Sequence, residues 1–282
     1  MNARTSAFLR SGILGAILVL GASSSTSAAQ IVGGVRIIDR SVEEGLELCV
    51  VNTNLAAITL TITVKPDNAR TDHPMPMIVS VPGPGTHPFT RLRPIQTDSD
   101  FGYRVRYDWL FGAREATHDS AHIYQLPFAS GRQFEVVQGF HGSFTHGGND
   151  DFAVDFGMPE GTPIHAAREG VVEIVVDRFD KGGLDPNLRD SVNFVLVRQA
   201  DGTYAEYVHL RRKGAKVKPG QAVKAGDLIG LSGNTGYTRG PHLHFAVFRA
   251  IDGQRRETFP MRFRSRENPA AEPIEGTAYT AP

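Results

Sequence analysis

Hydrophobic and polar positions alternate in short runs through the first part of this chain. The runs recur between residues 30 and 128, and segments rich in Pro, Gly, Asp and Asn separate them. Alternation with a period of two predicts strands that bury one face. We therefore expect a small all-β sandwich over residues 30–128, with strands at Val35–Ile38, Leu46–Val51, Ala56–Val64, Met77–Val81 and Phe101–Trp109.

Short apolar runs continue from residue 129 to residue 263, with more glycine between them. Two segments that begin at Gly161 and Gly220 resemble each other, because each has Gly-x-x-Val/Ile and then a second Gly before aliphatic residues. Glycine permits tight turns and β-branched side chains fill a core. The pattern predicts a mainly β protein whose second domain is a compact, curved antiparallel sheet. Residues 264–282 are polar and rich in Pro, Ala and Glu, so we expect a flexible tail.

The N-terminus has the features of a secretory signal peptide. Arg4 and Arg10 flank the start of an apolar stretch that is too short to span a bilayer, and small residues follow it. We expect residues 1–29 to be removed and the mature chain to be exported to the periplasm or the extracellular space, with a Gram-negative periplasm favoured. A membrane anchor is the alternative. No second apolar span follows, so we expect no stable membrane insertion after cleavage.

The charge of the chain limits its classes of partner, and its cysteine content limits how the fold can be stabilised. The chain has 30 basic and 30 acidic residues, and removal of residues 1–29 leaves a net charge of −2. This balance favours neither nucleic acid nor an anionic membrane as a partner. Cys49 is the one cysteine of the sequence, so the fold cannot depend on an internal disulfide, and we expect this side chain to be buried in a strand.

Two histidines in one predicted strand carry the first chemical signal. His242 and His244 stand one residue apart in Gly-Pro-His-Leu-His-Phe, and a strand directs alternate side chains to the same face. Two imidazoles on one face of an apolar strand suit metal binding and proton transfer. A catalytic zinc uses three nitrogen or oxygen ligands and keeps one open position. His146, Asp155 and His244 can supply such a set.

Asp155 stands in the apolar segment Phe-Ala-Val-Asp-Phe-Gly-Met, where an ionised carboxylate requires compensation. A metal ion meets this requirement, and backbone donors or an arginine are the alternative. Asp150 and Asp151 lie nearer to His146, but their loop is rich in Gly and Asn, so we expect them to be solvated.

Five motifs in a fixed order resemble a known family. They are His followed by Asp-Phe-x-Met-Pro-x-Gly-Thr-Pro, then Ala-Ala-Arg-x-Gly-Val-Val, Tyr-x-His-Leu, Gly-x-x-Val-x-x-Gly-x-x-Ile-Gly and Gly-Pro-His-Leu-His-Phe. Over about residues 129–250 they resemble the lysostaphin/LytM-type zinc endopeptidases of bacterial cell walls. The resemblance implies a LytM-type zinc peptidase domain over residues 129–263. It also implies hydrolysis of peptide bonds in peptidoglycan stem peptides or cross-links, with peptidoglycan peptides as the partners.

The resemblance implies roles for individual residues. The zinc ligands of the family match His146, Asp155 and His244, and its non-ligand catalytic pair matches His209 and His242. Zinc would lower the pKa of a bound water toward about 7. The two other histidines would transfer protons or stabilise the oxyanion. Many family members have three residues between the first histidine and the aspartate, whereas this chain has eight. His141 is therefore the alternative first ligand.

Other interpretations of the sequence lead to different functions. A catalytically silent relative on the same fold would bind the wall or regulate an amidase, and it would lack part of the ligand set. A lipoyl- or biotinyl-type carrier would explain Val217–Gly230 but not the histidines.

His118 and His122 have the spacing of a helical metal pair, but no zincin glutamate accompanies them, so we expect a connector. A basic stretch either contacts an anionic wall polymer or is solvated; its residues are Arg249, Arg255, Arg256, Arg262, Arg264 and Arg266.

Overall fold

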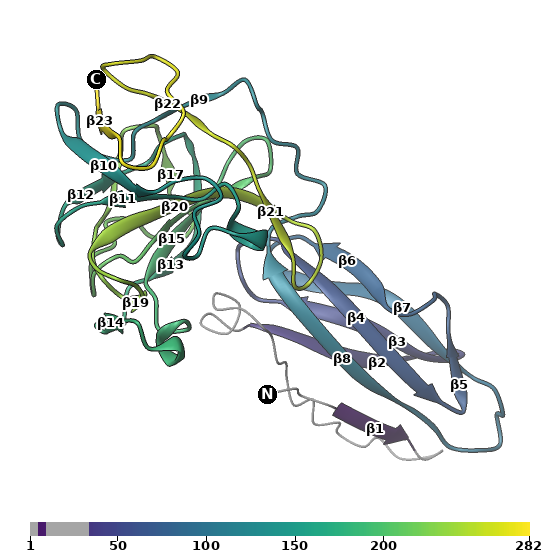
Figure 1. Ribbon diagram of the computed structural model, residues 1–282. Coiled ribbons are helices and arrows are strands. Elements are labelled where there is room, and N and C mark those ends of the chain that lie inside the picture. Colours follow the sequence, from purple (N-terminus) through teal and green to yellow (C-terminus); the bar gives the residue numbers. More distant parts are fainter. Residues whose placement is uncertain (1–4, 10–33) are drawn as a thin grey trace. The chain divides into compact units, whose positions relative to one another are not determined.

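The computed structural model describes residues 5–9 and 34–282, and it is nearly all β (Figure 1). The predicted signal peptide, residues 1–29, lies outside this part of the chain apart from residues 5–9. No helix within the described ranges has the length and apolar character to cross a membrane. The chain divides into two compact units, which are unit 1 (Met1–Arg114 with Ala250–Arg255) and unit 2 (Glu115–Arg249 with Arg256–Pro282).

Unit 1 is the β-sandwich that the alternation predicts. Its two four-stranded sheets have the orders β1-β8-β4-β6 and β2-β3-β7-β5. The Tyr107 hydroxyl on β8 donates to the Val35 carbonyl on β2 at 3.1 Å, which ties one sheet to the other. The bounds of the strands are β1 Thr5–Leu9, β2 Val35–Val42, β3 Gly45–Asn52, β4 Ile58–Asp67, β5 Ala69–Thr71, β6 Met77–Val81, β7 Gly85–Pro94 and β8 Phe101–Phe111.

Strand β7 is not indicated by the alternation of the sequence, and neither is β5. β7 lies between β3 and β5 although it contains Pro88, which cannot donate a hydrogen bond to a neighbouring strand. The register of β3 and β7 shifts between Leu48 and Cys49, opposite Pro88, and a β-bulge of this kind accommodates a proline. Cys49 itself is buried in β3, as expected.

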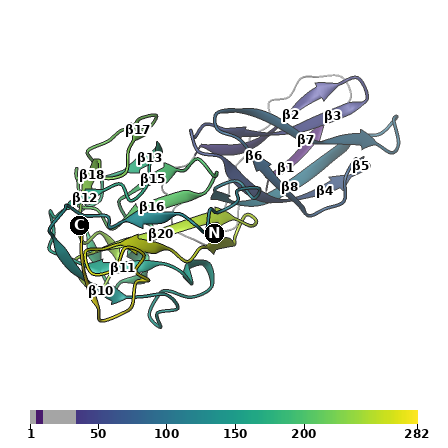
Figure 2. The ribbon, with the colours of Figure 1, turned by 90° about the horizontal axis from the view of Figure 1, so that it is seen from above.

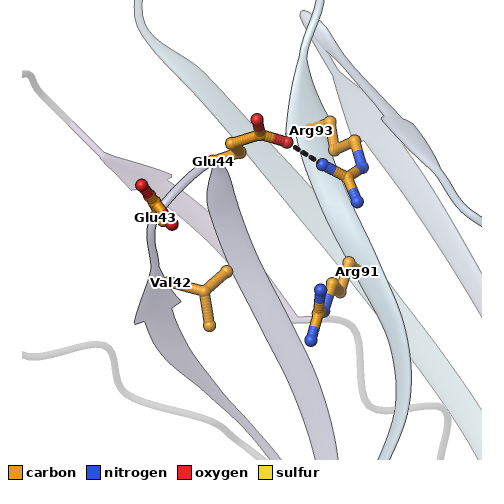
Figure 3. A pocket seen from close by; sticks show the side chains of 5 residues that line it. All are labelled: Val42, Glu43, Glu44, Arg91 and Arg93. Carbon is orange, nitrogen blue, oxygen red and sulfur yellow. Dashed lines mark hydrogen bonds and ion pairs between the residues drawn. The ribbon is translucent and has the colours of Figure 1, made fainter.

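Charged side chains surround a hollow in unit 1 beside the turn between β2 and β3 (Figure 3). Its walls are Val42, Glu43, Glu44, Arg91 and Arg93. Arg93 forms an ion pair with Glu44, and Arg91 lies 3.3 Å from Glu47. Both arginines are therefore already neutralised, and we assign no function to this hollow.

Unit 2 is built around a nine-stranded sheet with the order β17-β13-β15-β16-β20-β11-β10-β23, to which β21 adds beside β20 (Figure 2). The strands are β10 Gln133–Gln138, β11 Val154–Gly157, β13 Gly170–Val176, β15 Phe194–Arg198, β16 Tyr204–Val208, β17 Ala222–Val223, β20 His242–Ala250, β21 Arg256–Thr258 and β23 Ala278–Thr280.

Shorter pairs complete unit 2: β9 (Ile123–Gln125) with β22 (Arg262–Arg264), β12 (Pro163–His165) with β18 (Leu228–Leu231), and β14 (Gly182–Gly183) with β19 (Gly236–Tyr237). Two 3-10 turns, η1 (Gly148–Asp150) and η2 (Pro186–Leu188), lie in its loops. These observations confirm the mainly β fold class.

Unit 2 begins at Glu115 rather than at residue 129, where we expected the second domain to start. Strand β9 pairs in parallel with β22, and Tyr124, Leu126 and Phe128 are all buried in the core of unit 2. The alternation in this short segment therefore belongs to the second core. His118 and His122 precede β9 outside any strand or helix, which agrees with a connector.

The prediction of a flexible tail at residues 264–282 is wrong. Strand β23 pairs antiparallel with β10, and Tyr279 and Ala281 are buried in the core of unit 2. The Tyr279 hydroxyl donates to the Glu272 carbonyl at 2.7 Å and accepts from the Ile274 amide at 3.1 Å. The segment is ordered despite its polar composition, because the apolar side chains of Tyr279 and Ala281 pack into the core and β23 completes the edge of the sheet.

We expect the Tyr279→Ala variant to lose about 3 kcal/mol of unfolding free energy, because the substitution empties a buried aromatic site. Urea unfolding of the purified protein measures this loss. Ile274→Ala is the matched control in the same segment, because the Ile274 side chain is 60% exposed. The control is expected to change stability by less than about 0.5 kcal/mol. Equal stability of the two variants would contradict the docked strand.

Candidate active site

The pairing of β11 with β20 brings an aspartate and two histidines together. Asp155 on β11 stands opposite His244 on β20, and Gly157 stands opposite His242. His244 Nδ1 lies 2.9 Å from Asp155 Oδ1, and His242 Nε2 lies 3.7 Å from Asp155 Oδ2. Both histidines therefore point to the same face of the strand, as the spacing predicts.

His146 joins this group from the loop between β10 and β11. Its Nε2 lies 3.2 Å from Asp155 Oδ1, and its side chain is buried. Its Nδ1 donates to the Gly139 carbonyl at 2.8 Å, which orients the ring so that Nε2 is directed at Asp155. His141, the alternative first ligand, is exposed and packs its ring against Phe152. The structure thus brings His146 to Asp155 and leaves His141 outside the group.

The donor atoms of His146, Asp155 and His244 fit a divalent metal ion. They all lie within 4.8 Å of one another, and they comprise two imidazole nitrogens and one carboxylate oxygen. Zinc accepts these donors in catalytic sites. Burial alone would raise the pKa of Asp155, but hydrogen bonds from His146 and His244 lower it well below its usual range. An ionised carboxylate therefore faces two imidazole nitrogens in a position that favours positive charge.

A second carboxylate orients His244 from the other side of its ring. His244 Nε2 lies 3.4 Å from Glu206 Oε1 on β16, which leaves Nδ1 directed at Asp155. Burial alone would lower the pKa of His244, but its hydrogen bonds to Asp155 and Glu206 raise it to about 10. A metal ion bound at Nδ1 would displace this proton, and the bond to Glu206 would then fix the tautomer.

Arg256 on β21 neutralises Glu206. Its guanidinium bonds both oxygens of Glu206 and also forms an ion pair with Asp150 in η1. Burial alone would raise the pKa of Glu206, but the charge of Arg256 and the bond from His244 lower it to about 2. The carboxylates of Asp150 and Glu206 also lie within reach of His244, but Arg256 already supplies the cation there. This second group is therefore an ion-pair network rather than a metal site.

His209 and His242 form a separate imidazole pair beside the three donors. Their ring centroids are 4.4 Å apart. His242 Nδ1 donates to the Gly240 carbonyl at 2.8 Å, and His209 Nδ1 donates to the Thr235 carbonyl at 2.7 Å. Carbonyl oxygens only accept, so Nδ1 of each ring carries a hydrogen and Nε2 is the nitrogen left for proton transfer. Burial and then the charges of His242 and His244 lower the pKa of His209 to about 3, so this ring is neutral at neutral pH.

A buried network holds His209 in an unusual backbone conformation just after β16. Its φ of 65° lies in the left-handed region, which residues other than glycine seldom adopt. The Asn193 side chain donates to the Leu210 carbonyl at 3.1 Å, and the Thr235 hydroxyl donates to the same oxygen at 2.8 Å. These contacts fix the turn that aims the imidazole at His242.

Sequence reasoning missed Glu206, Arg256 and the role of Asp150. Asp150 was expected to be solvated, and it is half-buried against Arg256. The available signal was a single acid, Glu206, within a strand whose other residues are apolar. Arginines of the basic stretch also form ion pairs with nearby acids. Arg249 pairs with Glu257, and Arg255 pairs with Asp252 three residues earlier.

Comparisons with known proteins find sequence similarity over the part of the chain that carries most of these residues. Residues 150–257 match the sequence model of peptidase family M23. The peptidoglycan DD-endopeptidase ShyA of Vibrio cholerae is 38% identical over 93 residues, which are 33% of this chain and 19% of ShyA. The glycyl-glycine endopeptidase ALE-1 of Staphylococcus capitis is 39% identical over 100 residues, which are 35% of this chain and 24% of ALE-1. The chain therefore spans less than a quarter of either relative.

Among solved structures, the catalytic domain of lysostaphin from Staphylococcus simulans is 27% identical, with a TM-score of 0.30 over 45% of this chain and 87% of that domain. The family match begins after His146 and includes Asp155, His209, His242 and His244. It also includes four of the five motifs in full. Residues 150–257 thus resemble peptidase family M23, and the comparisons support the lysostaphin/LytM-type metalloendopeptidase family that the sequence motifs indicated.

Proposed function

We propose that this chain is an exported zinc-dependent endopeptidase that hydrolyses peptide bonds in peptidoglycan stem peptides or cross-links. The observation that carries the proposal is the convergence of three potential metal-ligand atoms beside a pair of imidazoles. His146, Asp155 and His244 would bind the metal. His209 and His242 would act in catalysis without binding the metal. A catalytically silent relative has no need for all five side chains in this arrangement, so their convergence supports an enzyme.

Zinc is the metal that the donor set favours, because two imidazoles and one carboxylate form a typical catalytic zinc site with room for a fourth ligand. When bound, zinc supplies Lewis-acid polarisation of a carbonyl and a lowered pKa for a water molecule. Glu206 would hold the His244 tautomer, and the Gly139 carbonyl would hold that of His146.

His209 and His242 would move the protons of the reaction. With Nδ1 of each ring bonded to a backbone carbonyl, Nε2 is the atom that can accept a proton from the attacking water. A ring protonated in this way can then donate to the leaving amine or to the oxyanion of the tetrahedral intermediate. The backbone carbonyls of Thr235 and Gly240 keep both rings oriented throughout, because they stay bonded to Nδ1.

The proposed substrate and the proposed export rest on two further observations. Two relatives named above are a peptidoglycan DD-endopeptidase and a glycyl-glycine endopeptidase, and the family match contains Asp155 and the histidine pair. The first 29 residues have the pattern of a secretory signal peptide, which would carry the enzyme to the wall.

Incubation of the mature protein with purified peptidoglycan tests the proposed function. We expect peptides to be released by peptide-bond cleavage at a rate that falls about a hundredfold or more after treatment with a chelator, because the metal supplies several kcal/mol of transition-state stabilisation. Added Zn²⁺ is expected to restore the rate. Mass spectrometry of the released peptides identifies the cleaved bond. A rate that the chelator leaves unchanged would rule out a metal-dependent peptidase.

Substitution of the two histidines of β20 separates metal binding from proton transfer. We expect His244→Ala to lose zinc and activity together. His242→Ala is expected to keep about one zinc per chain and to lose roughly 10²–10⁴-fold in kcat. Metal analysis and peptide release measure the two properties. His165→Ala is the control, because this histidine of β12 lies outside both groups of potential ligands. If His242→Ala cleaves at the wild-type rate, the proposed division of roles is wrong.

Glu206→Gln tests the carboxylate behind His244. The substitution keeps the size of the side chain but removes the charge that holds the His244 tautomer, so we expect zinc affinity to fall by roughly 10–100-fold. Competition with a chromophoric chelator measures the dissociation constant, and circular dichroism checks the fold. Glu257→Gln removes an exposed glutamate from another ion pair of unit 2 and is expected to leave the constant unchanged. Equal constants for wild type and Glu206→Gln would refute this role.

A further inference from the structure

Two stacked aromatic rings with an arginine at each end lie along one edge of the candidate site. Arg239 Cζ lies 3.6 Å from the centre of the Phe144 ring, and Arg189 Cζ lies 4.5 Å from the centre of the Tyr237 ring. The two rings stack on each other, with centroids 5.8 Å apart and planes 26° apart. We call these four residues the arginine–aromatic rim. None of them has a role in the proposed chemistry.

The rim is tied to the catalytic histidines by short stretches of backbone. Phe144 stands two residues before His146 in the same loop. Arg239 occupies the centre of a turn in which the Thr238 hydroxyl donates to the Gly240 carbonyl at 2.7 Å. The same carbonyl accepts from His242 Nδ1. The backbone of Arg239 is therefore held by the turn that orients the His242 ring, and the rim lies at the site rather than elsewhere on unit 2.

A second loop is fixed to this turn by strand pairing. β14 and β19 pair in parallel, with Gly182 opposite Gly236 and Gly183 opposite Tyr237. A Cβ atom on Gly182 would lie 1.5 Å from the Asn234 carbonyl oxygen, so the two backbones meet closer than any side chain permits. The loop from residue 177 to residue 192, which carries Arg189, is thereby anchored beside Tyr237. In Figure 1, β14 and β19 lie together with η2 at one end of the unit.

The two rim arginines have no acidic partner among the residues that the structure describes. Both are exposed, and neither forms an ion pair there. The Cζ atom of each guanidinium lies over a ring, and a guanidinium that stacks on a ring keeps its in-plane N–H donors available. A guanidinium whose orientation is restrained and whose edge is unoccupied is suited to bidentate binding of a carboxylate.

We propose that the arginine–aromatic rim binds a free carboxylate group of the substrate, with Arg239 as the principal contact, so that the enzyme prefers peptides that carry this group near the cleaved bond. The inference rests on the proposed peptidase function and adds the chemical class of substrate. Arg239 is favoured over Arg189 because its turn is bonded directly to His242. Phe144 and Tyr237 act as positioning residues, because they restrain the guanidinium groups.

The test uses soluble cross-linked peptidoglycan fragments and the same fragments with their carboxyl groups converted to carboxamides. Fluorescence titration measures the dissociation constant of each labelled preparation, and chromatography measures kcat/KM. We expect wild type to bind and cleave the acid form about tenfold better or more, because a charge-assisted contact is lost in the amide. Arg239→Gln is expected to lower binding and kcat/KM for the acid form alone, through KM rather than kcat. Arg239→Lys is expected to retain part of the preference.

Arg132→Gln is the matched control, because Arg132 is also exposed and lies 5.6 Å from an aromatic ring, that of Phe134. It is expected to keep the full preference for the acid form. The inference is overturned if wild type binds both forms equally, or if Arg239→Gln weakens both forms by the same factor. Absence of cleavage with either form would contradict the proposed function instead, and the binding measurements would still decide whether the rim recognises a carboxylate.

Discussion

The antiparallel register between β11 and β20 is the constraint on which the rest of the site depends. Asp155 and His244 are opposite residues in this register, and His242 follows two positions away on the same face. The alternate residues Phe156 and Phe245 are buried in the core below. A slip of one residue would move the core side chains to the site and the site side chains to the core. The packing that stabilises unit 2 therefore also sets the geometry of its chemistry.

Charge balance is the second organising feature, because buried ionised groups are costly unless they are paired. Glu206 and Asp150 both pair with Arg256, whereas the ion-pair partners of Asp155 among the described residues are histidines. The part of the network that lacks a permanent cation is therefore the part suited to a metal ion. Arg256 thus lies on the Glu206 side of the His244 ring, and the proposed metal position lies on the Asp155 side.

Loops supply the side chains that the sheet cannot. His146 and His209 lie outside the strands, and hydrogen bonds to the carbonyls of Gly139 and Thr235 orient their rings. Such placement is typical of functional residues carried by loops on a rigid scaffold. The same arrangement brings Phe144 and Arg239 to the edge of the site. The loops thus determine both the orientation of the catalytic rings and the surface that a substrate meets.

The sequence by itself determined the mainly β class, the family and the pairing of two histidines on one face, because these depend on alternation and on motifs of adjacent residues. It left His146 and His141 as alternatives, since an eight-residue gap does not reveal which ring reaches Asp155. Only the tertiary structure decided that His146 does so, that Arg256 neutralises Glu206 and that Tyr279 is docked. Each of these contacts joins residues from separate strands and loops, so folding of unit 2 decides them and local pattern cannot.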